Sequence, residues 1–251
     1  DCFDTALEAC RIAVTYRTPV IMLSDGYLGN GAEPWKVPDL AEIPRIDPNF
    51  ATEPNTTAAD GSPRFMPYRR DPQTLARPWA LPGTKGLEHR VGGLEKSAHT
   101  GAISYDPANH EEMVATRAAK VKGIAKTIPP TAVDDPSGDA DVLVLGWGSA
   151  YGPITAAVRR VRARGLSIAQ AHVRHLNPLP EDLGDVLRRY RQIVVPEMNT
   201  GQFAMLLRSK YLIDVKTISR VRGLPISPVD LCDELCRHCG DSKGSDDTRE
   251  A

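Results

Sequence analysis

Three of the five cysteines stand close together near the end of the sequence. They lie in LCDELCRHCG (231–240) with the spacing C-x3-C-x2-C, and thiolates spaced in this way can bind an iron–sulfur cluster. On a helix, however, Cys232, Cys236 and Cys239 occupy positions i, i+4 and i+7 and share one face. A cluster needs a chain that wraps around it and a fourth ligand. We therefore expect small, buried cysteines on the sheet-facing side of a helix, and no metal site.

A glycine turn, LGWGSAYGP (145–153), is a second place suited to chemistry. It follows an apolar strand and opens a helix, so that backbone N–H groups and the positive helix end would point at an anion. Its spacing differs from the dinucleotide fingerprint, and His172-Val173-Arg174 stands where a ribose-binding acid is expected. NAD is therefore disfavoured. NADP bound through Arg174, another anionic ligand and a turn that only packs remain open.

Polar residues also follow the next two predicted strands. HVRHLNPLP (172–180) carries two His and one Arg but no nearby Cys or acid, which favours a structural or interface role over a metal site. Glu197, Asn199 and Gln202 lie beside a helix start, with no proton partner or nucleophile in the local sequence. An interface or structural role is favoured for these three residues too.

A loop rich in Gly, His and basic residues occupies positions 82–109. Its Lys85, Arg90 and Lys96 could bind an anionic ligand, or they could belong to a loop that faces solvent or a partner. The sequence contains no G-x-S-x-G, H-E-x-x-H or G-x-x-x-x-G-K-[ST] motif. Catalysis by this chain alone therefore has no recognisable local motif.

Strands and helices alternate through residues 136–240, and they would position most of these side chains. Four short apolar runs, beginning with DVLVLGW, are each followed by an amphipathic helix. Alternation at this spacing predicts a parallel sheet with right-handed crossovers and helices on its faces. Ser227 is the expected N-cap of the last helix.

The first 30 residues resemble the end of another α/β domain. Apolar residues at helical spacing predict a helix with one apolar face, formed by Phe3, Ala6, Leu7, Cys10 and Val14. The apolar run Val20–Leu23 predicts a strand covered on both sides, in the middle of a parallel sheet. One strand cannot form a sheet, so we infer that the chain is a fragment of a longer polypeptide.

The segment from Gly26 to Pro82 is rich in Pro, Gly and Asn and has little periodicity. A stretch of this length predicts a connector laid over the surface or a binding loop. Its aromatic residues argue against disorder. After the loop at 82–109 we expect a helix over 108–126, begun by Asp106-Pro107.

The composition is that of an ordinary globular protein. The chain has 251 residues, 41% of them hydrophobic and 25% charged, with a formal net charge of −1. This charge makes no electrostatic case for nucleic acid or an anionic membrane surface. We find neither an apolar run long enough to span a membrane nor a signal-peptide core. Five cysteines are too few for a disulfide scaffold, which predicts reduced thiols and a cytoplasmic protein.

Several stretches together resemble one enzyme family, and they cover about residues 1–232. They are LSDGYLGNGAEPW, PGTKGLEHRVGGLEKSAHTGAISYDPANHEEMVATRAAKV, VLVLGWGSAYGPITAAV, RHLNPLP and VVPEMNTGQFAMLLR…RGLPISP. This set is similar to the α subunit of the two-subunit 2-oxoacid:ferredoxin oxidoreductases, most of all the 2-oxoglutarate type. Such enzymes decarboxylate a 2-oxo acid oxidatively on thiamine diphosphate, form acyl-CoA from coenzyme A and reduce ferredoxin. For 2-oxoglutarate this is a step of the tricarboxylic acid cycle.

The resemblance implies an order of domains and a set of partners. Residues 1–30 would be the truncated tail of a thiamine pyrimidine-binding-like domain, 31–135 a connector and loop segment with one helix, 136–240 a transketolase C-terminal-like domain and 241–251 a disordered tail. A β subunit would carry the diphosphate, Mg²⁺ and the [4Fe–4S] cluster in an α2β2 assembly, without nucleic acid or membrane.

The resemblance also implies where coenzyme A and the partner would meet this chain. Gly148, Ser149 and Tyr151 would form the turn that faces coenzyme A, and Lys85, Arg90 and Lys96 would pair with its anionic groups. The catalytic residues near the oxo acid would lie upstream of this chain. Glu197, Asn199 and Gln202 are assigned to the interface.

Two other readings of the sequence stay open. One is a thiamine enzyme chain of transketolase or 2-oxoacid dehydrogenase type, and the other is a non-catalytic module that binds NADP or coenzyme A.

Overall fold

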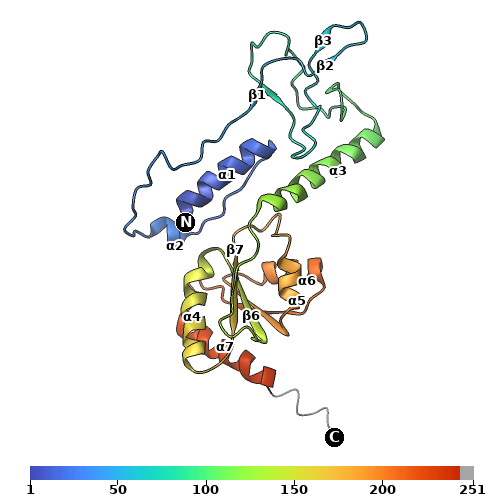
Figure 1. Ribbon diagram of the computed structural model, residues 1–251. Coiled ribbons are helices and arrows are strands. Elements are labelled where there is room, and N and C mark those ends of the chain that lie inside the picture. Colours follow the sequence, from blue (N-terminus) through green and yellow to red (C-terminus); the bar gives the residue numbers. More distant parts are fainter. Residues whose placement is uncertain (244–251) are drawn as a thin grey trace. The chain divides into compact units, whose positions relative to one another are not determined.

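The computed structural model describes residues 1–243, and in it the chain forms two compact units (Figure 1). The first unit comprises Asp1–Met22 and Trp35–Ala125. The second comprises Leu23–Pro34 and the chain from Lys126 onward. We call them the loop unit and the sheet unit. The sheet unit begins ten residues before the predicted boundary at 136 and also takes in a segment near the N-terminus. The assignment of these parts to named domains stays a prediction.

A five-stranded sheet forms the centre of the sheet unit. Its order is β5-β7-β6-β8-β9, in which the last four strands are parallel and β5 is antiparallel to its neighbour. The strands are β5 (Val133–Asp134), β6 (Val142–Trp147), β7 (Ala169–Val173), β8 (Gln192–Glu197) and β9 (Val215–Ser219). The four predicted strands are thereby confirmed. The two-residue β5 was not predicted, because so short a segment carries no periodicity.

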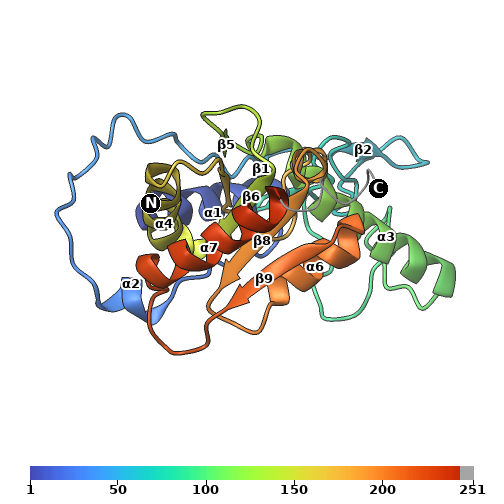
Figure 2. The ribbon, with the colours of Figure 1, turned by 90° about the horizontal axis from the view of Figure 1, so that it is seen from below.

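Helices cover both faces of this sheet (Figures 1 and 2). On one face lie α4 (Tyr151–Ala163) and α7 (Pro228–Lys243), and on the other lie α5 (Leu183–Arg188) and α6 (Gln202–Tyr211). The central strand β6 serves both faces, since Leu143 and Leu145 enter one core while Val142 and Val144 enter the other. Side chains on a strand alternate in direction, so an uninterrupted apolar run is what a doubly covered strand needs. Burial of each such side chain contributes about 1.5–3 kcal/mol.

The three cysteines of α7 pack on the sheet, as predicted. Cys232 and Cys239 are buried in the core between α4 and α7, and Cys236 lies partly buried against the same core. Burial raises the pKa of the Cys232 thiol. The N-cap prediction is also confirmed, because Ser227 Oγ accepts a hydrogen bond from the Asp230 amide at 3.3 Å. The helix continues to Lys243, three residues into the predicted tail, and the rest of that predicted tail lies outside the described residues.

Two long helices belong to the loop unit, α1 (Cys2–Tyr16) and α3 (Pro107–Ile124), which is continued by the 3-10 turn η1 (Ala125–Thr127). The predicted start of α3 is confirmed, since the Asp106 carboxylate accepts from the Ala108 amide and Pro107 is the first helical residue. The two helices pack through a small core formed by Ile12, Tyr16 and Ile124.

The predicted apolar face of α1 is only partly buried, since Ala6, Leu7 and Val14 are intermediate in exposure. Phe3 and Cys10, two of its five predicted members, are exposed in this chain, and the helix buries Ile12 and Tyr16 instead. Periodicity identifies an apolar stripe, but the neighbouring elements decide which part of the helix surface is covered.

Short strands and side-chain hydrogen bonds give the rest of the loop unit its order. β1 (Phe50–Ala51) pairs in parallel with β4 (Trp79–Ala80), and β2 (Thr56–Thr57) pairs antiparallel with β3 (Pro63–Arg64). Asn55 bonds both backbone groups of Met66, at 2.8 and 3.0 Å. Such side-chain bonds replace the long ladders that this Pro-rich sequence cannot form.

The predicted strand over Val20–Leu23 is absent. These residues have no regular structure and are exposed, with Ile21 at 83%. A strand needs a hydrogen-bonded neighbour, and the residues that the structure describes offer none to this segment. The short helix α2 (Gly26–Asn30) follows it.

Candidate functional site

The carboxyl end of β6 lies where the order of the sheet changes direction. The chain passes from β6 to β7 on one side and later returns to β8 on the other side of β6. The helices that follow β6 and β8 cover opposite faces of the sheet. In open parallel sheets, ligands bind in the crevice that opens at such a point. The residues that follow β6 and β8 are therefore the candidate site.

The glycine turn after β6 has the backbone geometry that its sequence predicts. A Cβ on Gly146 would lie 2.6 Å from Ile154 Cδ1 and 3.0 Å from His172 Nδ1, so a larger residue would have to displace both side chains. Gly148 has φ +58°, in the left-handed region, and begins the 3-10 turn η2 (Gly148–Ala150) that leads into α4. Trp147 lies against Phe203 of α6, with ring centroids 6.0 Å apart.

Ser149 is held by an acidic residue that the sequence did not reveal as part of the site. The Asp25 carboxylate accepts hydrogen bonds from the Ser149 side chain and from the Leu28 amide, which lower the pKa of Asp25. Asp25 is thus both the N-cap of α2 and the residue that ties the segment 23–34 to the glycine turn. An Asp-Gly pair before a helix signals a cap, but nothing in the sequence says that this cap returns to a turn more than a hundred residues away.

Tyr151 and His172 form the other side of the turn. Tyr151 is exposed and meets the His172 ring edge-on at 5.1 Å. Burial, and to a lesser extent the charge of Arg174, lower the pKa of His172 to about 4. Its imidazole is therefore neutral at pH 7, and its buried Nδ1 has no hydrogen-bond partner. This side chain can accept a hydrogen bond but cannot supply positive charge to an anion.

The three predicted interface residues after β8 differ in their surroundings. Glu197 is 1% exposed, and its two carboxylate oxygens accept from the Phe203 and Ala204 amides at 3.0 Å each. It therefore stabilises the start of α6 from inside the domain and presents no carboxylate to a partner. Asn199 Oδ1 accepts from the amides of Gly201 and Gln202 at the same helix start. Gln202 is exposed, and an interface role for Asn199 and Gln202 stays a prediction.

The predicted basic residues lie in the loop unit, whereas the glycine turn lies in the sheet unit. Lys85 and Arg90 are exposed. Lys96 is only 3% exposed, and its ammonium group donates to the carbonyl oxygens of Gly92 and Leu94 at 3.1 and 2.7 Å. Its charge is thus used to hold its own loop, which argues against Lys96 as a partner for a ligand.

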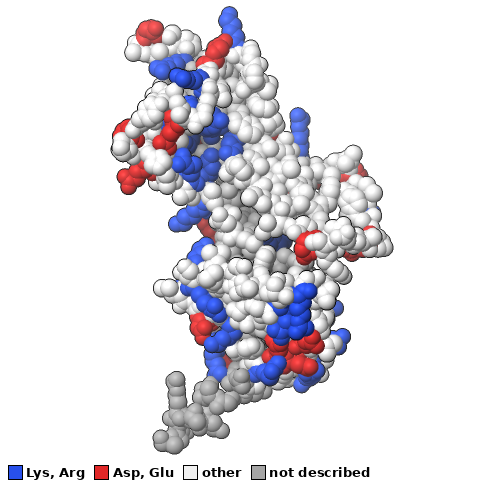
Figure 3. Space-filling model, turned by 180° about the vertical axis from the view of Figure 1, so that it is seen from behind, with Lys and Arg blue, Asp and Glu red and all other residues white. Residues whose placement is uncertain are grey.

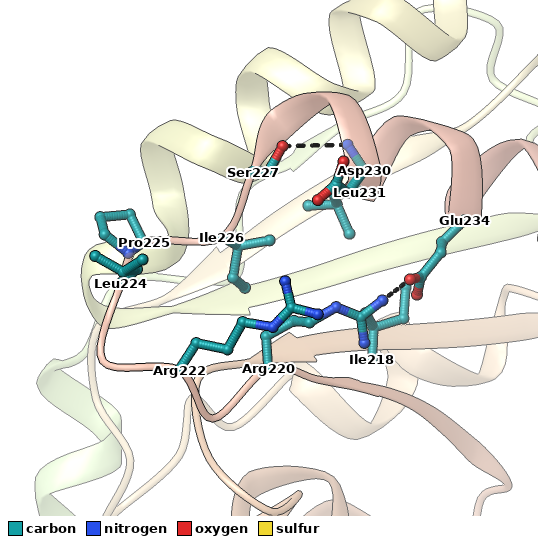
Figure 4. A pocket seen from close by; sticks show the side chains of 10 residues that line it. All are labelled: Ile218, Arg220, Arg222, Leu224, Pro225, Ile226, Ser227, Asp230, Leu231 and Glu234. Atoms are coloured by element: carbon teal, nitrogen blue, oxygen red, sulfur yellow. Dashed lines mark hydrogen bonds and ion pairs between the residues drawn. The ribbon is translucent and has the colours of Figure 1, made fainter.

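A small cavity of about 150 Å³ lies at the start of α7, beside the carboxyl end of β9 (Figure 4). Arg220 forms an ion pair with Glu234 across it. Ligand sites usually measure about 300–1,000 Å³, so this cavity is too small to be the main site. Its lining residues are Ile218, Arg220, Arg222, Leu224, Pro225, Ile226, Ser227, Asp230, Leu231 and Glu234.

Residues 1–243 offer neither a metal-binding group nor a membrane-spanning helix. No group of three or more His, Cys, Asp or Glu side chains there is arranged to hold a metal ion. No helix in the same range is long and apolar enough to cross a membrane.

Two family models match the chain, one on each side of residue 120. Residues 1–104 match the model "Pyruvate flavodoxin/ferredoxin oxidoreductase, thiamine diP-bdg". Residues 140–231 match "Pyruvate:ferredoxin oxidoreductase core domain II", which covers the sheet described above. The chain thus contains regions similar to two different domains of the same kind of enzyme, one after the other.

Curated relatives and a solved structure agree with these models. The chain is 54% identical over 237 residues to the 2-oxoglutarate oxidoreductase subunit KorA of Mycobacterium tuberculosis, which is 94% of this chain and 34% of that protein. It is 30% identical to the α subunit of 2-oxoacid:ferredoxin oxidoreductase 1 of Aeropyrum pernix, over 82% of this chain and 32% of that one. The 2-oxoglutarate:ferredoxin oxidoreductase of Magnetococcus marinus superposes with a TM-score of 0.83 and 29% identity, over 95% of this chain and 40% of that one.

These matches define the class of protein: the chain belongs to the 2-oxoacid:ferredoxin oxidoreductases. Within that family it is most similar to part of an α subunit of the 2-oxoglutarate type. It spans about a third of the length of the first two curated relatives. The resemblance seen in the sequence is thereby confirmed.

Proposed function

We propose that this chain is part of the α subunit of a thiamine-dependent 2-oxoglutarate:ferredoxin oxidoreductase. The complete complex would decarboxylate 2-oxoglutarate oxidatively, transfer the acyl group to coenzyme A and reduce ferredoxin. The observation that carries the proposal is 54% identity, over 94% of this chain, to a 2-oxoglutarate oxidoreductase subunit. The superposed Magnetococcus enzyme adds support, because that enzyme holds 2-oxoglutarate, coenzyme A and succinyl-CoA.

We further propose that a β subunit completes the enzyme and holds most of its cofactors. The partner would hold the diphosphate, Mg²⁺ and a [4Fe–4S] cluster in an α2β2 assembly, and ferredoxin would take the electrons. In residues 1–243 no side-chain cluster fits a metal ion. Exposed apolar side chains between residues 20 and 40 support a protein partner. They are Val20, Ile21, Met22, Leu23, Tyr27, Leu28, Trp35, Val37 and Leu40.

The proposed location of the complex is the cytoplasm. All five cysteines are free, as the reducing environment of that compartment would keep them.

Within the complex, the crevice after β6 would contribute to coenzyme A binding. Gly148 and Tyr151 are exposed there, while Ser149 is already bonded to the Asp25 carboxylate. That negative charge disfavours a phosphate beside Ser149. We therefore assign to this turn the uncharged amide part of the coenzyme A arm, which has donors and acceptors but no charge.

The composition of the purified complex tests the proposed partner. The full-length polypeptide, produced together with its candidate β subunit, should co-purify with iron and acid-labile sulfide. A polypeptide that purifies without a second subunit, iron or sulfide would contradict the proposal.

Ser149 variants of the same complex test the turn. Ser149→Asp places a second carboxylate beside Asp25 and should raise the KM for coenzyme A about tenfold or more, with the KM for 2-oxoglutarate unchanged. Ser149→Ala is the matched variant without added charge and should have a smaller effect. An unchanged KM for coenzyme A in Ser149→Asp would exclude the turn from that site and leave the enzyme assignment untouched.

A further inference from the structure

Four basic side chains gather around one face of α3 in the loop unit. Met113 and Ile124, both buried, mark the face that α3 turns toward its neighbours. Lys120 stands seven residues after Met113 and four before Ile124, so helical periodicity places it on that same face. A lysine there is unusual, since such positions are normally apolar. Figure 3 shows basic side chains gathered on one face of this unit.

Arginines approach this face at both of its ends. At one end, Arg70 donates to Ala98 O at 2.9 Å and lies 3.2 Å from the sulfur of Met113. At the other end, Arg17 follows directly after Tyr16, which packs with Ile124. The third arginine, Arg77, shares an aromatic partner with Arg70. The guanidinium carbons of Arg70 and Arg77 lie 5.5 and 5.3 Å from the centre of the Tyr68 ring.

Aromatic rings and backbone carbonyls hold these arginines in place, and no carboxylate among residues 1–243 does. Arg17 lies 4.1 Å above the Trp79 ring and donates to the carbonyls of Val14 and Pro48. Contacts of this kind fix a guanidinium without neutralising it, so that its charge stays available. The buried Nε of Arg17 has no hydrogen-bond partner.

The cluster lacks counter-charges within the part of the chain that the structure describes. None of the four basic side chains there forms an ion pair, and neither Arg77 nor Lys120 makes a hydrogen bond to an acceptor. Asp47 and Glu112 act on Arg17 and Arg70 from a distance, but neither pairs with them. Glu112 pairs with His99 instead, at 3.4 Å.

The cost of this arrangement is visible at Lys120. Its burial, together with the charges of Arg70, Arg77 and Arg17, lowers the pKa of its ammonium group to about 8. Four half-buried cations without an anion destabilise the unit that holds them. A bound anion would relieve the repulsion among these cations. Such a cluster therefore favours anion binding.

We propose that Arg17, Arg70, Arg77 and Lys120 form a binding site for a phosphate-bearing small molecule. A diphosphate is compact and carries several charges, so one group can meet several of these cations at once. Guanidinium groups bind phosphate oxygens in pairs, and lysine adds a point charge. Tyr68 and Trp79 provide apolar surfaces that reduce solvent screening of these contacts. The site lies within the loop unit and does not depend on the proposed function.

The small-molecule reading is favoured over an acidic protein surface by the burial of the cluster. All four cations and both rings are only half-exposed. A small anion can enter between such groups, while carboxylates on a protein surface pair best with side chains that project into solvent.

The test is calorimetric titration of the 251-residue chain with pyrophosphate at constant ionic strength. We expect saturable binding with one site per chain. Lys120→Met and Arg77→Gln should each weaken it about tenfold or more, since each removes one charge-assisted contact. Lys122→Met on the same helix is the matched control, because Lys122 is exposed and outside the cluster; it should bind as the unchanged chain does.

A second arm separates the two sources of negative charge. A decaglutamate peptide should bind more weakly than pyrophosphate, and its binding should not depend on Lys120. Absence of saturable pyrophosphate binding, or equal binding by the unchanged chain and Lys120→Met, would overturn the proposal. Tight peptide binding that is lost in Lys120→Met would overturn it in favour of an acidic partner. Misfolding does not confuse the result, because Lys120→Met should stabilise the loop unit.

Discussion

The two units of this chain obtain their order in different ways. The sheet unit buries continuous apolar strands between two layers of helices, and its two core clusters are formed by its own residues. The loop unit has four strands of two residues each, a helix pair with a three-residue core and many bonds from side chains to backbone. Hydrophobic burial thus stabilises one unit, while local hydrogen bonds and ring contacts hold the other.

This difference indicates where function is placed. A unit that completes its own core can present a fixed crevice at the end of its sheet. A unit with exposed apolar residues and unpaired cations is suited to bind a protein partner that covers the apolar residues, or an anion that pairs with the cations.

The largest expected effect comes from opening the core of the sheet unit. Leu143→Ala on the central strand should lower the free energy of unfolding by about 3 kcal/mol, because Leu143 is fully buried in a rigid core that cannot collapse around the cavity. Leu87→Ala in the loop unit should lower it by only about 2 kcal/mol, although Leu87 is almost as buried, since it lies outside the core clusters and its surroundings can collapse more fully. Urea unfolding followed by circular dichroism measures both free energies. Equal losses in the two variants would contradict the proposed difference between the two units.

A smaller effect is expected at Glu197, which joins β8 to the start of α6. Glu197→Gln keeps one acceptor oxygen but loses the charge and one of the two bonds to the Phe203 and Ala204 amides. Stability of the sheet unit should fall by about 1–3 kcal/mol. Thermal unfolding of the variant gives the value. An unchanged melting temperature would mean that the buried carboxylate has another role.

Unlike the changes above, Lys120→Met should stabilise the protein, because it removes a cation that three arginines repel. The loop unit should gain about 1 kcal/mol at pH 7 and not more, since solvent screens part of this repulsion at a half-exposed group. The folded unit, in which the pKa is about 8, binds fewer protons than the unfolded chain, where the pKa is near 10.5. The unchanged chain should therefore gain stability as pH rises from 8 to 10.5, and the advantage of the variant should shrink over that window. Unfolding at pH 7 and pH 10 tests this; a constant advantage would contradict it.

The smallest perturbation is thiol labelling. Cys2 and Cys10 in the loop unit are exposed, whereas Cys232 and Cys239 in the sheet unit are buried. Two thiols should react rapidly with a disulfide reagent at pH 8, and Cys232 and Cys239 should react only as the sheet unit unfolds, because burial also raises the pKa of Cys232. Rapid reaction of Cys232 or Cys239 in the folded chain would show that this core opens easily.

The sequence predicted the sheet unit well for a physical reason. Each strand is apolar on both sides and each helix has one apolar stripe, so local pattern and final burial agree from DVLVLGW to LCDELCRH. The run Val20–Leu23 carries the same signal and forms no strand, because a strand also needs a neighbour.

The candidate site was predicted less completely. The glycine turn was identified because Gly148 follows a strand and precedes a helix. Asp25 was missed because its partner Ser149 is far away in the sequence. Lys96 was assigned to a ligand because of its charge, but burial directed that charge to two nearby carbonyl oxygens. The basic cluster was missed because its members come from three separate segments.

We propose that this chain belongs to an enzyme that acts on 2-oxoglutarate only together with a second subunit. The most direct measurement is the reduction of ferredoxin by the assembled complex, with 2-oxoglutarate and coenzyme A supplied together and then each left out. We predict reduction that requires both compounds and yields succinyl-CoA in proportion, with no reduction by this chain alone. An assembled complex that leaves ferredoxin oxidised with 2-oxoglutarate and coenzyme A present would contradict the account.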